Sequence, residues 1–160
     1  MRELGAPSNQ THFTSQMTVT LTASYQEFLA ADTVSKIEEL LDESYALEDM
    51  LEFIDEYNET QFVTYYEEYV RCGEAIGYEA VDALISENGE MSCIEGCDDR
   101  YRGCYHDEAE FTEEMYSEMY SLPDAIVVDW QATWDQNLRY DFTSCNDGTS
   151  YRSCHIFSDY

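Results

Sequence analysis

Cysteine and histidine are the residues of this chain best suited to metal or thiol chemistry. There are six Cys and three His. Cys93, Cys97 and Cys104 lie close to His106, but their C-x3-C-x6-C spacing lacks the C-x2-C knuckle of common zinc sites. We therefore expect reduced cysteines that serve packing, no metal ligands and no cofactor. A cysteine-based metal-binding regulatory protein is the alternative.

The other chemically active groups do not form a recognisable catalytic set. Cys154 and His155 are neighbours in a segment expected to be a strand, where adjacent side chains point to opposite faces, so a catalytic dyad is not expected. A glycosidase needs one pair of carboxyl groups, and nothing distinguishes two among 35 Asp and Glu. No calcium-binding loop pattern is present. We expect no enzyme and no catalytic residue.

Charge is the strongest feature of the chain. The 35 Asp and Glu against seven Lys and Arg give a net charge of −28, far from the magnitude of about 2–8 that suits a small domain. Such a chain repels nucleic acid and anionic membranes and attracts basic protein surfaces. Duplex DNA carries the same charge over roughly 14 base pairs, or about 48 Å. A protein of this length could span that distance, so its size is compatible with DNA mimicry. The alternative explanation of the charge is a solvated surface or halophilic adaptation.

Composition indicates a folded protein with a core. The chain has 160 residues, of which 44% are hydrophobic and 14% aromatic, which argues against a disordered acidic tail. The first 20 residues are polar and contain no signal-peptide core, and no apolar run reaches the roughly 18 residues of a membrane span. We expect a cytoplasmic protein with reduced thiols.

Periodic apolar residues predict helices in the first part of the chain. The expected helices cover 32–43, with Asp32 as N-cap, and then 46–57, 60–72 and 78–87. In the second of these, the apolar stripe consists of Leu47, Met50, Leu51 and Ile54. Short joints between the helices favour a small antiparallel bundle. Before them we expect a polar arm over 1–16 and a strand over 17–23.

The last third of the chain predicts a mixture of helices and strands. Asp107 and Glu110 resemble a capping box for a helix that reaches about Tyr120, before a Leu-Pro break. Residues 126–128 are a strand candidate, and Asp129 is expected to cap a helix through Leu138. Residues 140–144 and 151–157 flank Asp-Gly and predict a hairpin.

These elements place the chain in the α+β class. We expect an elongated protein in which a small helical bundle precedes a mixed α/β C-terminal unit with a short antiparallel sheet. The predicted divisions are 1–43 for an N-terminal arm and first helix, 44–90 for an acidic helical domain, and 91–160 for the C-terminal domain.

The helix predicted over 46–57 carries an acidic stripe on a different face from its apolar stripe. Between Ile37 and Glu68 there are twelve acids and no Lys or Arg. Like charges four residues apart destabilise a helix by a few tenths of a kcal/mol per pair, and ordinary solvated faces interleave bases instead. The missing bases indicate a surface that binds a basic partner.

Several segments resemble antirestriction proteins of the ArdA type. They are ALEDMLEFIDEYNETQF (46–62), YRGCYHDEAEFTEEM (101–115) and LPDAIVVDWQATWDQNLRYDF (122–142), followed by HIF at 155–157. The order and spacing are similar to the middle and C-terminal domains of that family, from about Ser44 onward. Residues 1–43 lack the family's usual opening strand, and the cysteine-rich stretch over 92–104 is not a family feature.

The resemblance implies an elongated, curved, dimeric DNA mimic without enzymatic activity. It would occupy the basic DNA-binding channel of a type I restriction-modification methyltransferase in the bacterial host cytoplasm, without contacting nucleic acid or membrane. A CRISPR effector or a nucleoid protein is the alternative target. The expected phosphate-mimicking carboxylates are Glu48, Glu52, Asp55, Glu56, Glu59, Glu110, Glu113, Glu114 and Glu118.

Two further expectations concern assembly and shape. A homodimer is expected to pair through the apolar C-terminal segment, with Ile126, Val127, Val128, Trp130 and Trp134 as interface candidates. Internal salt bridges that fix the shape of the acidic region are expected from Arg100, Arg102 and Arg139.

Overall fold

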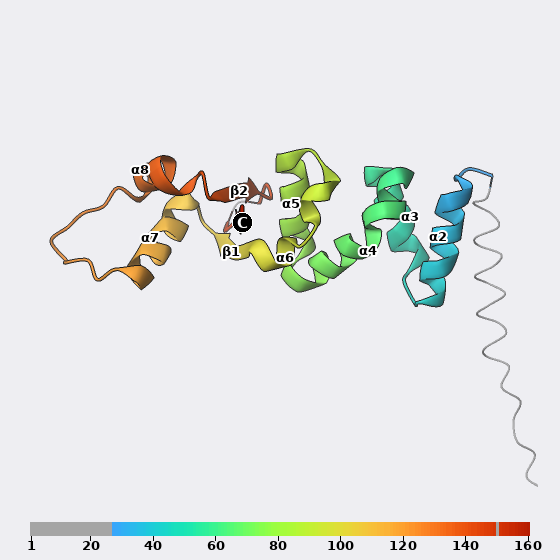
Figure 1. Cartoon of the computed structure of the whole chain (residues 1–160), viewed down its shortest axis with the longest axis horizontal. Helices are drawn as coiled ribbons and strands as arrows, with labels where there is room; N and C mark the ends of the chain where they lie inside the picture. Colours follow the sequence, from blue (N-terminus) through green and yellow to red (C-terminus); the bar gives the residue numbers. More distant parts are fainter. Residues whose placement is uncertain (1–26, 150) are drawn as a thin grey trace, which may run out of the picture. The chain divides into compact units, whose positions relative to one another are not determined.

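The computed structural model describes residues 27–149 and 151–160 (Figure 1). The arm over 1–16 and the strand over 17–23 lie outside the described residues. The described residues form seven α-helices and a three-stranded antiparallel sheet, which confirms the α+β class. They divide into two compact units between Tyr66 and Glu67. This division differs from the predicted ones after residues 43 and 90.

The first unit, over residues 27–66, is built from three helical segments. They are α2 (Ala31–Asp42), α3 (Leu47–Tyr57) and the beginning of α4 (Glu59–Ile76). Apolar side chains from all three form the core, and three of them are aromatic: the Phe53 ring lies edge-on to Tyr66 at 5.3 Å, and Phe62 lies 5.0 Å from Tyr66. The buried set is Val34, Ile37, Leu40, Met50, Phe53, Phe62 and Tyr66.

The apolar stripe predicted on α3 was right for Met50 but omitted Phe53. Met50 and Phe53 are buried, whereas Leu51 and Ile54 are half-buried. Phe53 was missed although it lies three residues after Met50, because Leu47, Leu51 and Ile54 already completed an aliphatic helical pattern. The aromatic partners that bury it come from α4, which the local pattern of α3 does not contain.

The predicted N-cap of α2 was wrong. The helix begins at Ala31, and Asp32 lies inside its first turn without capping it. The backbone N–H of Ala30 instead donates to Glu59 Oε2 at 2.7 Å, and the Thr33 hydroxyl donates to the same oxygen at 2.7 Å. A carboxylate from α4 therefore satisfies donors at the start of α2 that a local cap would otherwise serve.

Helix α4 extends beyond the helix predicted over 60–72, because Gly73 does not end it. A Cβ at Gly73 would lie 2.2 Å from Tyr78 Cε1, so the missing side chain lets the Tyr78 ring pack on the helix. The chain breaks at Gly77, whose φ of +95° suits glycine. Then follow α5 (Tyr78–Asn88), the 3-10 helix η1 (Met91–Ile94) and α6 (Cys97–Arg100).

The sheet lies within the second unit, over residues 67–160, and has the strand order β1-β3-β2. The predicted hairpin is confirmed as β2 (Phe142–Asn146) and β3 (Cys154–Ser158), which pair antiparallel. The other edge strand, β1 (Tyr101–Tyr105), was not predicted. Its short sequence has no clear apolar alternation and contains Gly103, so its strand conformation depends on pairing with β3.

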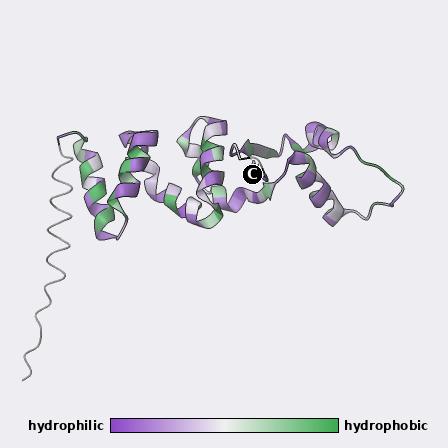
Figure 2. Cartoon of the chain, turned by 180° about the vertical axis from the view of Figure 1, so that it is seen from behind, coloured by the Kyte–Doolittle hydropathy of each residue, from purple (hydrophilic) through white to green (hydrophobic). Residues whose placement is uncertain are grey.

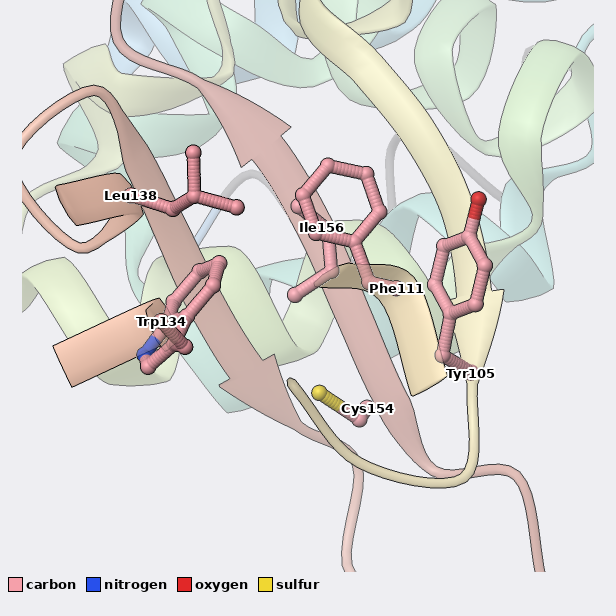
Figure 3. Packing of buried hydrophobic residues seen from close by; sticks show 6 residues of the cluster. All are labelled: Tyr105, Phe111, Trp134, Leu138, Cys154 and Ile156. Atoms are coloured by element: carbon pink, nitrogen blue, oxygen red, sulfur yellow. The ribbon is translucent and has the colours of Figure 1, made fainter. Parts of the chain in front are cut away.

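Helices cover both faces of the central strand. Figure 1 shows the sheet between α5 on one side and α7 (Glu108–Met119) with α8 (Trp130–Thr133) on the other. On the α7 side, Phe111 meets Trp134 and Phe142 edge-on. Figure 3 shows that cluster, which comprises Tyr105, Phe111, Trp134, Leu138, Cys154 and Ile156. Every residue of β3 is buried, as expected of a strand covered on both sides.

Both caps predicted in the C-terminal part are confirmed. Asp107 Oδ1 accepts the N–H of Glu110 at 2.9 Å at the start of α7, and Asp129 Oδ1 accepts that of Ala132 at 2.9 Å at the start of α8. The helix after Asp129 reaches Leu138 as predicted, but its last part, η2 (Trp134–Leu138), is a π-helix.

The strand predicted over 126–128 was wrong, since these residues belong to the loop between α7 and α8. The Ile126 N–H donates to the Pro123 carbonyl at 3.0 Å, which closes a turn. Val127 is 97% exposed, and no described strand pairs with this segment. An apolar run without a neighbouring strand edge cannot satisfy its backbone groups as a strand.

Candidate partner-binding surface

The carboxylates predicted on α3 lie on the exposed side of that helix. Glu48, Glu52, Asp55 and Glu56 are all exposed, and together they form the α3 acidic face. Hydrophilic and hydrophobic colours alternate around α3 in Figure 2, because the helix packs its opposite side into the core. The helix contains no Lys or Arg. The α3 acidic face can therefore attract a basic surface.

Glu59, the fifth predicted residue of this stripe, has a different role. Its Oε2 accepts two hydrogen bonds at 2.7 Å, from the Thr33 hydroxyl and the Ala30 N–H. The bond from Thr33, followed by the one from Ala30, lowers the pKa of the Glu59 carboxyl. Glu59 is thus part of the internal support of the first unit, and the structure separates it from the α3 acidic face.

The carboxylates predicted on α7 also fall into two groups. Glu113, Glu114 and Glu118 are exposed and form the α7 acidic face. Glu110 is half-buried: it accepts the His106 N–H at 2.6 Å and pairs with Arg152 at 2.7 Å. The backbone bond from His106 and then the Arg152 contact lower the pKa of Glu110. Glu110 therefore fixes the start of α7 against the loop before β3.

The expected salt bridges of three arginines were wrong. Arg100 donates to the Cys93 carbonyl at 2.6 Å, Arg102 donates to the Ser158 hydroxyl at 3.0 Å, and Arg139 lies over the Tyr140 ring at 4.9 Å. Within the described residues, the arginines paired with carboxylates are Arg71 and Arg152. Sequence distance hid two of these pairs, because Asp98 lies 27 residues from Arg71 and Glu110 lies 42 residues from Arg152.

Few bases are available to neutralise the acidic surface. The described residues contain 34 Asp and Glu and six Lys and Arg. The first unit has twelve acids and one base, for a net −11, and the second has 22 acids and five bases, for a net −17. Each of the six bases contacts a carboxylate, a carbonyl, a hydroxyl or a ring of this same chain. Both units therefore keep a large net negative charge.

The predicted dimer-interface residues are not equivalent. Ile126 and Val127 are 54% and 97% exposed, whereas Val128 and Trp130 are half-buried. Trp130 lies 6.1 Å from the Tyr116 ring. Trp134 is only 5% exposed and belongs to the core around Phe111 (Figure 3). Trp134 is thus a packing residue and is not available as an interface residue.

A buried histidine–aspartate pair was not predicted. His155 Nε2 lies 2.7 Å from Asp147 Oδ2, and Nδ1 lies 3.0 Å from the Tyr101 hydroxyl. Burial raises the pKa of Asp147, but hydrogen bonds from His155 and Thr149 outweigh it, so the net pKa is below the ordinary value. The only available signal was Asp-Gly in a hairpin loop, which places Asp147 near the following strand. The pair ties that loop to β3.

The thiols do not form a reactive site. Cys104 lies 4.0 Å from His155 Nε2, but its thiol donates to the Arg152 carbonyl at 2.6 Å, and burial raises its pKa. Burial also raises the pKa of Cys145 to about 12 and of Cys154 to about 11. Cys154 packs with the α7 side while His155 contacts Tyr101, so the two face opposite ways. Thiolates are therefore disfavoured.

In residues 27–149 and 151–160, no three or more His, Cys, Asp and Glu are grouped so that they could hold a metal ion. Over the same residues, every helix is too short or too polar to cross a bilayer.

Comparison with protein-family models, curated proteins and solved structures gave no match. A functional interpretation therefore depends on the residue patterns and on the geometry of the acidic faces.

Proposed function

We propose that this protein is a non-enzymatic DNA mimic that inhibits a host DNA-binding defence enzyme, with a type I restriction-modification complex as the preferred target. The observation that carries the proposal is the α3 acidic face, an exposed row of carboxylates on a helix without bases. The resemblance of residues 46–62, 101–115 and 122–142 to antirestriction proteins supports the choice of target. The proposed site of action is the bacterial host cytoplasm.

The mechanism is electrostatic competition. A DNA-binding channel is lined with Lys and Arg that contact phosphates, and binding releases counterions. Carboxylates held on folded helices would occupy the same positions and exclude the duplex. Two sets carry this role in the proposal: the α3 acidic face and the α7 acidic face. Because the effect is distributed, no single carboxylate dominates.

A homodimer is part of the proposal. Its interface is the end of α7 with the loop that follows, where exposed apolar side chains gather within residues 119–127: Met119, Tyr120, Leu122, Ile126 and Val127. Exposed apolar side chains gathered in one segment are typical of contact surfaces. Native mass spectrometry of wild type and of Val127→Ser tests it. A dimer that becomes a monomer supports the interface, and a monomeric wild type contradicts it.

Competition with DNA tests the proposed function. A type I methyltransferase is bound to fluorescently labelled duplex, and this protein is titrated into the complex at low salt. We expect displacement of the duplex in proportion to the protein added. Polyglutamate at the same total charge is the matched control, because it has the charge without the fold. Failure to displace DNA, or displacement no better than by polyglutamate, contradicts the proposal.

If this target fails, a mimic of the same kind directed at a CRISPR effector or a nucleoid protein is the next candidate. Affinity capture from host lysate, with the α3 acidic face neutralised in a parallel sample, separates the targets.

A further inference from the structure

One arginine joins two elements of the second unit through four hydrogen bonds. Arg71 Nε and Nη2 donate to the two oxygens of Glu68, at 2.9 and 2.7 Å. Nη1 and Nη2 donate to the two oxygens of Asp98, at 2.7 and 2.9 Å. Glu68 lies on α4 and Asp98 on α6, 30 residues further along the chain. The planar guanidinium thus binds two carboxylates at once, which lysine cannot reproduce.

The same junction also holds the loop before α6. Glu68 Oε1 accepts the Gly96 N–H at 3.1 Å, and Gly96 has a φ of +62° that suits glycine. The Cys72 thiol lies 3.4 Å from the Ile94 carbonyl and is fully buried. The Arg71 contact lowers the pKa of both Glu68 and Asp98, so both carboxylates stay charged and the junction persists in mild acid.

This junction stands at the start of the segment that carries the α7 acidic face. Helix α6 ends at Arg100, and β1 begins at the next residue, Tyr101. Strand β1 pairs with β3 and ends at Tyr105, two residues before Asp107, the N-cap of α7. The position of α7 relative to residues 67–76 of α4 therefore depends on how α6 is held against this part of α4 and on how β1 pairs with β3.

We propose that Arg71 is a positioning residue for partner binding: it clamps α6 to α4 and so holds the carboxylates of the second unit in the arrangement that the partner recognises. This inference rests on the proposed function. An exposed single ion pair usually contributes little, but this contact is bidentate, involves two carboxylates and is extended by the Gly96 N–H.

Charge and geometry predict opposite effects when this residue is changed. Replacing Arg71 by glutamine makes the net charge one unit more negative than −28. If charge alone governed binding to a basic channel, the variant would bind as tightly as wild type or more tightly. If Arg71 acts as a clamp, the variant binds more weakly although it is more anionic.

The experiment compares Arg71→Gln with Arg71→Lys and with a matched control. Arg139→Gln removes the same charge from an exposed arginine that lies over the Tyr140 ring. Displacement of labelled DNA from the methyltransferase is measured for each protein. Hydrogen exchange over residues 93–105 reports the junction without any partner.

We expect Arg71→Gln to displace DNA roughly three- to fivefold less effectively than wild type, the upper range for an exposed ion pair. Arg71→Lys should fall between them, because it keeps the charge and loses the fork. Arg139→Gln should match or exceed wild type. Exchange of the Gly96 amide should accelerate in Arg71→Gln and remain unchanged in Arg139→Gln.

If wild type displaces DNA and Arg71→Gln equals Arg139→Gln, the positioning role is overturned while the proposed function stands. If wild type displaces no DNA, both fall. Unchanged exchange at Gly96 in Arg71→Gln overturns the clamp by itself, whatever the partner.

Discussion

The two compact units use their carboxylates differently. In the first unit, with twelve acids and one base, the α3 acidic face is exposed, and Glu59 supports the fold. In the second unit, four carboxylates are paired with Arg or His side chains of the same unit: Glu68, Asp98, Glu110 and Asp147. The same residue type thus serves either the surface or the scaffold, and the presence of a nearby base or helix start decides which. Net charge alone cannot separate these roles.

The largest expected effect comes from neutralising the exposed acidic faces. The triple variant Glu48→Gln, Glu52→Gln and Asp55→Asn should weaken DNA displacement by roughly 100-fold in 0.15 M salt, if each carboxylate replaces one phosphate contact. The matched variant Glu113→Gln, Glu114→Gln and Glu118→Gln should lose roughly tenfold, because the charge of the second unit is spread over more residues. Titration of the methyltransferase–DNA complex measures both.

The thermal stability of the two triple variants is the control for that comparison. Removing like charges at i, i+4 relieves repulsion within α3, so the thermal midpoint of the first triple variant should stay equal or rise. Weaker displacement together with a lowered midpoint would show loss of the fold instead of loss of contacts. Equal losses for the two triple variants would contradict the difference between the units.

The buried pair in the second unit should give the next largest effect. Asp147→Asn leaves His155 without its carboxylate partner, which should reduce the free energy of unfolding by about 1–3 kcal/mol. Both tryptophans of the chain, Trp130 and Trp134, lie in the second unit, so tryptophan fluorescence during denaturation reports that unit alone. Asp124→Asn, in the exposed loop, is the control. An unchanged fluorescence midpoint in Asp147→Asn would contradict a stabilising role for the pair.

Glu59→Gln should have a smaller effect, confined to the first unit. The substitution weakens the hydrogen bonds to Ala30 and Thr33, and partial exposure limits the loss to on the order of 1 kcal/mol. Helical circular dichroism should melt earlier while the fluorescence transition stays fixed. Glu52→Gln serves as the exposed control. If only the fluorescence transition shifted, the effect of Glu59 would lie in the second unit, and this would contradict the prediction.

The smallest expected effect is the loss of stability of the second unit at acidic pH. The pKa values of Glu68, Asp98, Glu110 and Asp147 lie below the ordinary values of 4.5 for Glu and 3.8 for Asp. A carboxyl group whose pKa is lowered in the folded state stabilises the fold when the pH is above the ordinary pKa of that group. This stabilisation is lost as the pH falls through the lowered pKa. The fluorescence midpoint of the second unit should therefore decline gradually below about pH 5. In Arg71→Gln, which lacks the contacts of Arg71 with Glu68 and Asp98, this decline should be smaller, and an equal decline would contradict their contribution.

Local sequence signals were sufficient for several elements. Helix α3 has a clear apolar period, α7 and α8 have Asp caps, and the hairpin of β2 and β3 surrounds Asp-Gly, and all of these were predicted close to their observed ends. The acidic stripe on α3 was also placed on the exposed side. Period, cap and turn are each contained within a few residues, so the sequence expresses them directly.

Long-range contacts account for the features that were missed. Strand β1 depends on pairing with β3 about 50 residues away. The internal roles of Glu59 and Glu110 require Thr33 and Arg152, which no local pattern connects to them. The apolar residues 126–128 looked like a strand, but they have no neighbouring strand to pair with.

Direct binding to the type I methyltransferase core across a salt series tests the central claim, that the exposed carboxylates replace DNA phosphates. Binding of this protein is measured by calorimetry from 50 to 200 mM salt, an interval of about fourfold over which phosphate contacts weaken strongly, in parallel with a duplex of about 14 base pairs. The account predicts that the two affinities fall with similar steep slopes and that saturating duplex abolishes binding of the protein. A slope near zero, or a ternary complex with DNA, would contradict it.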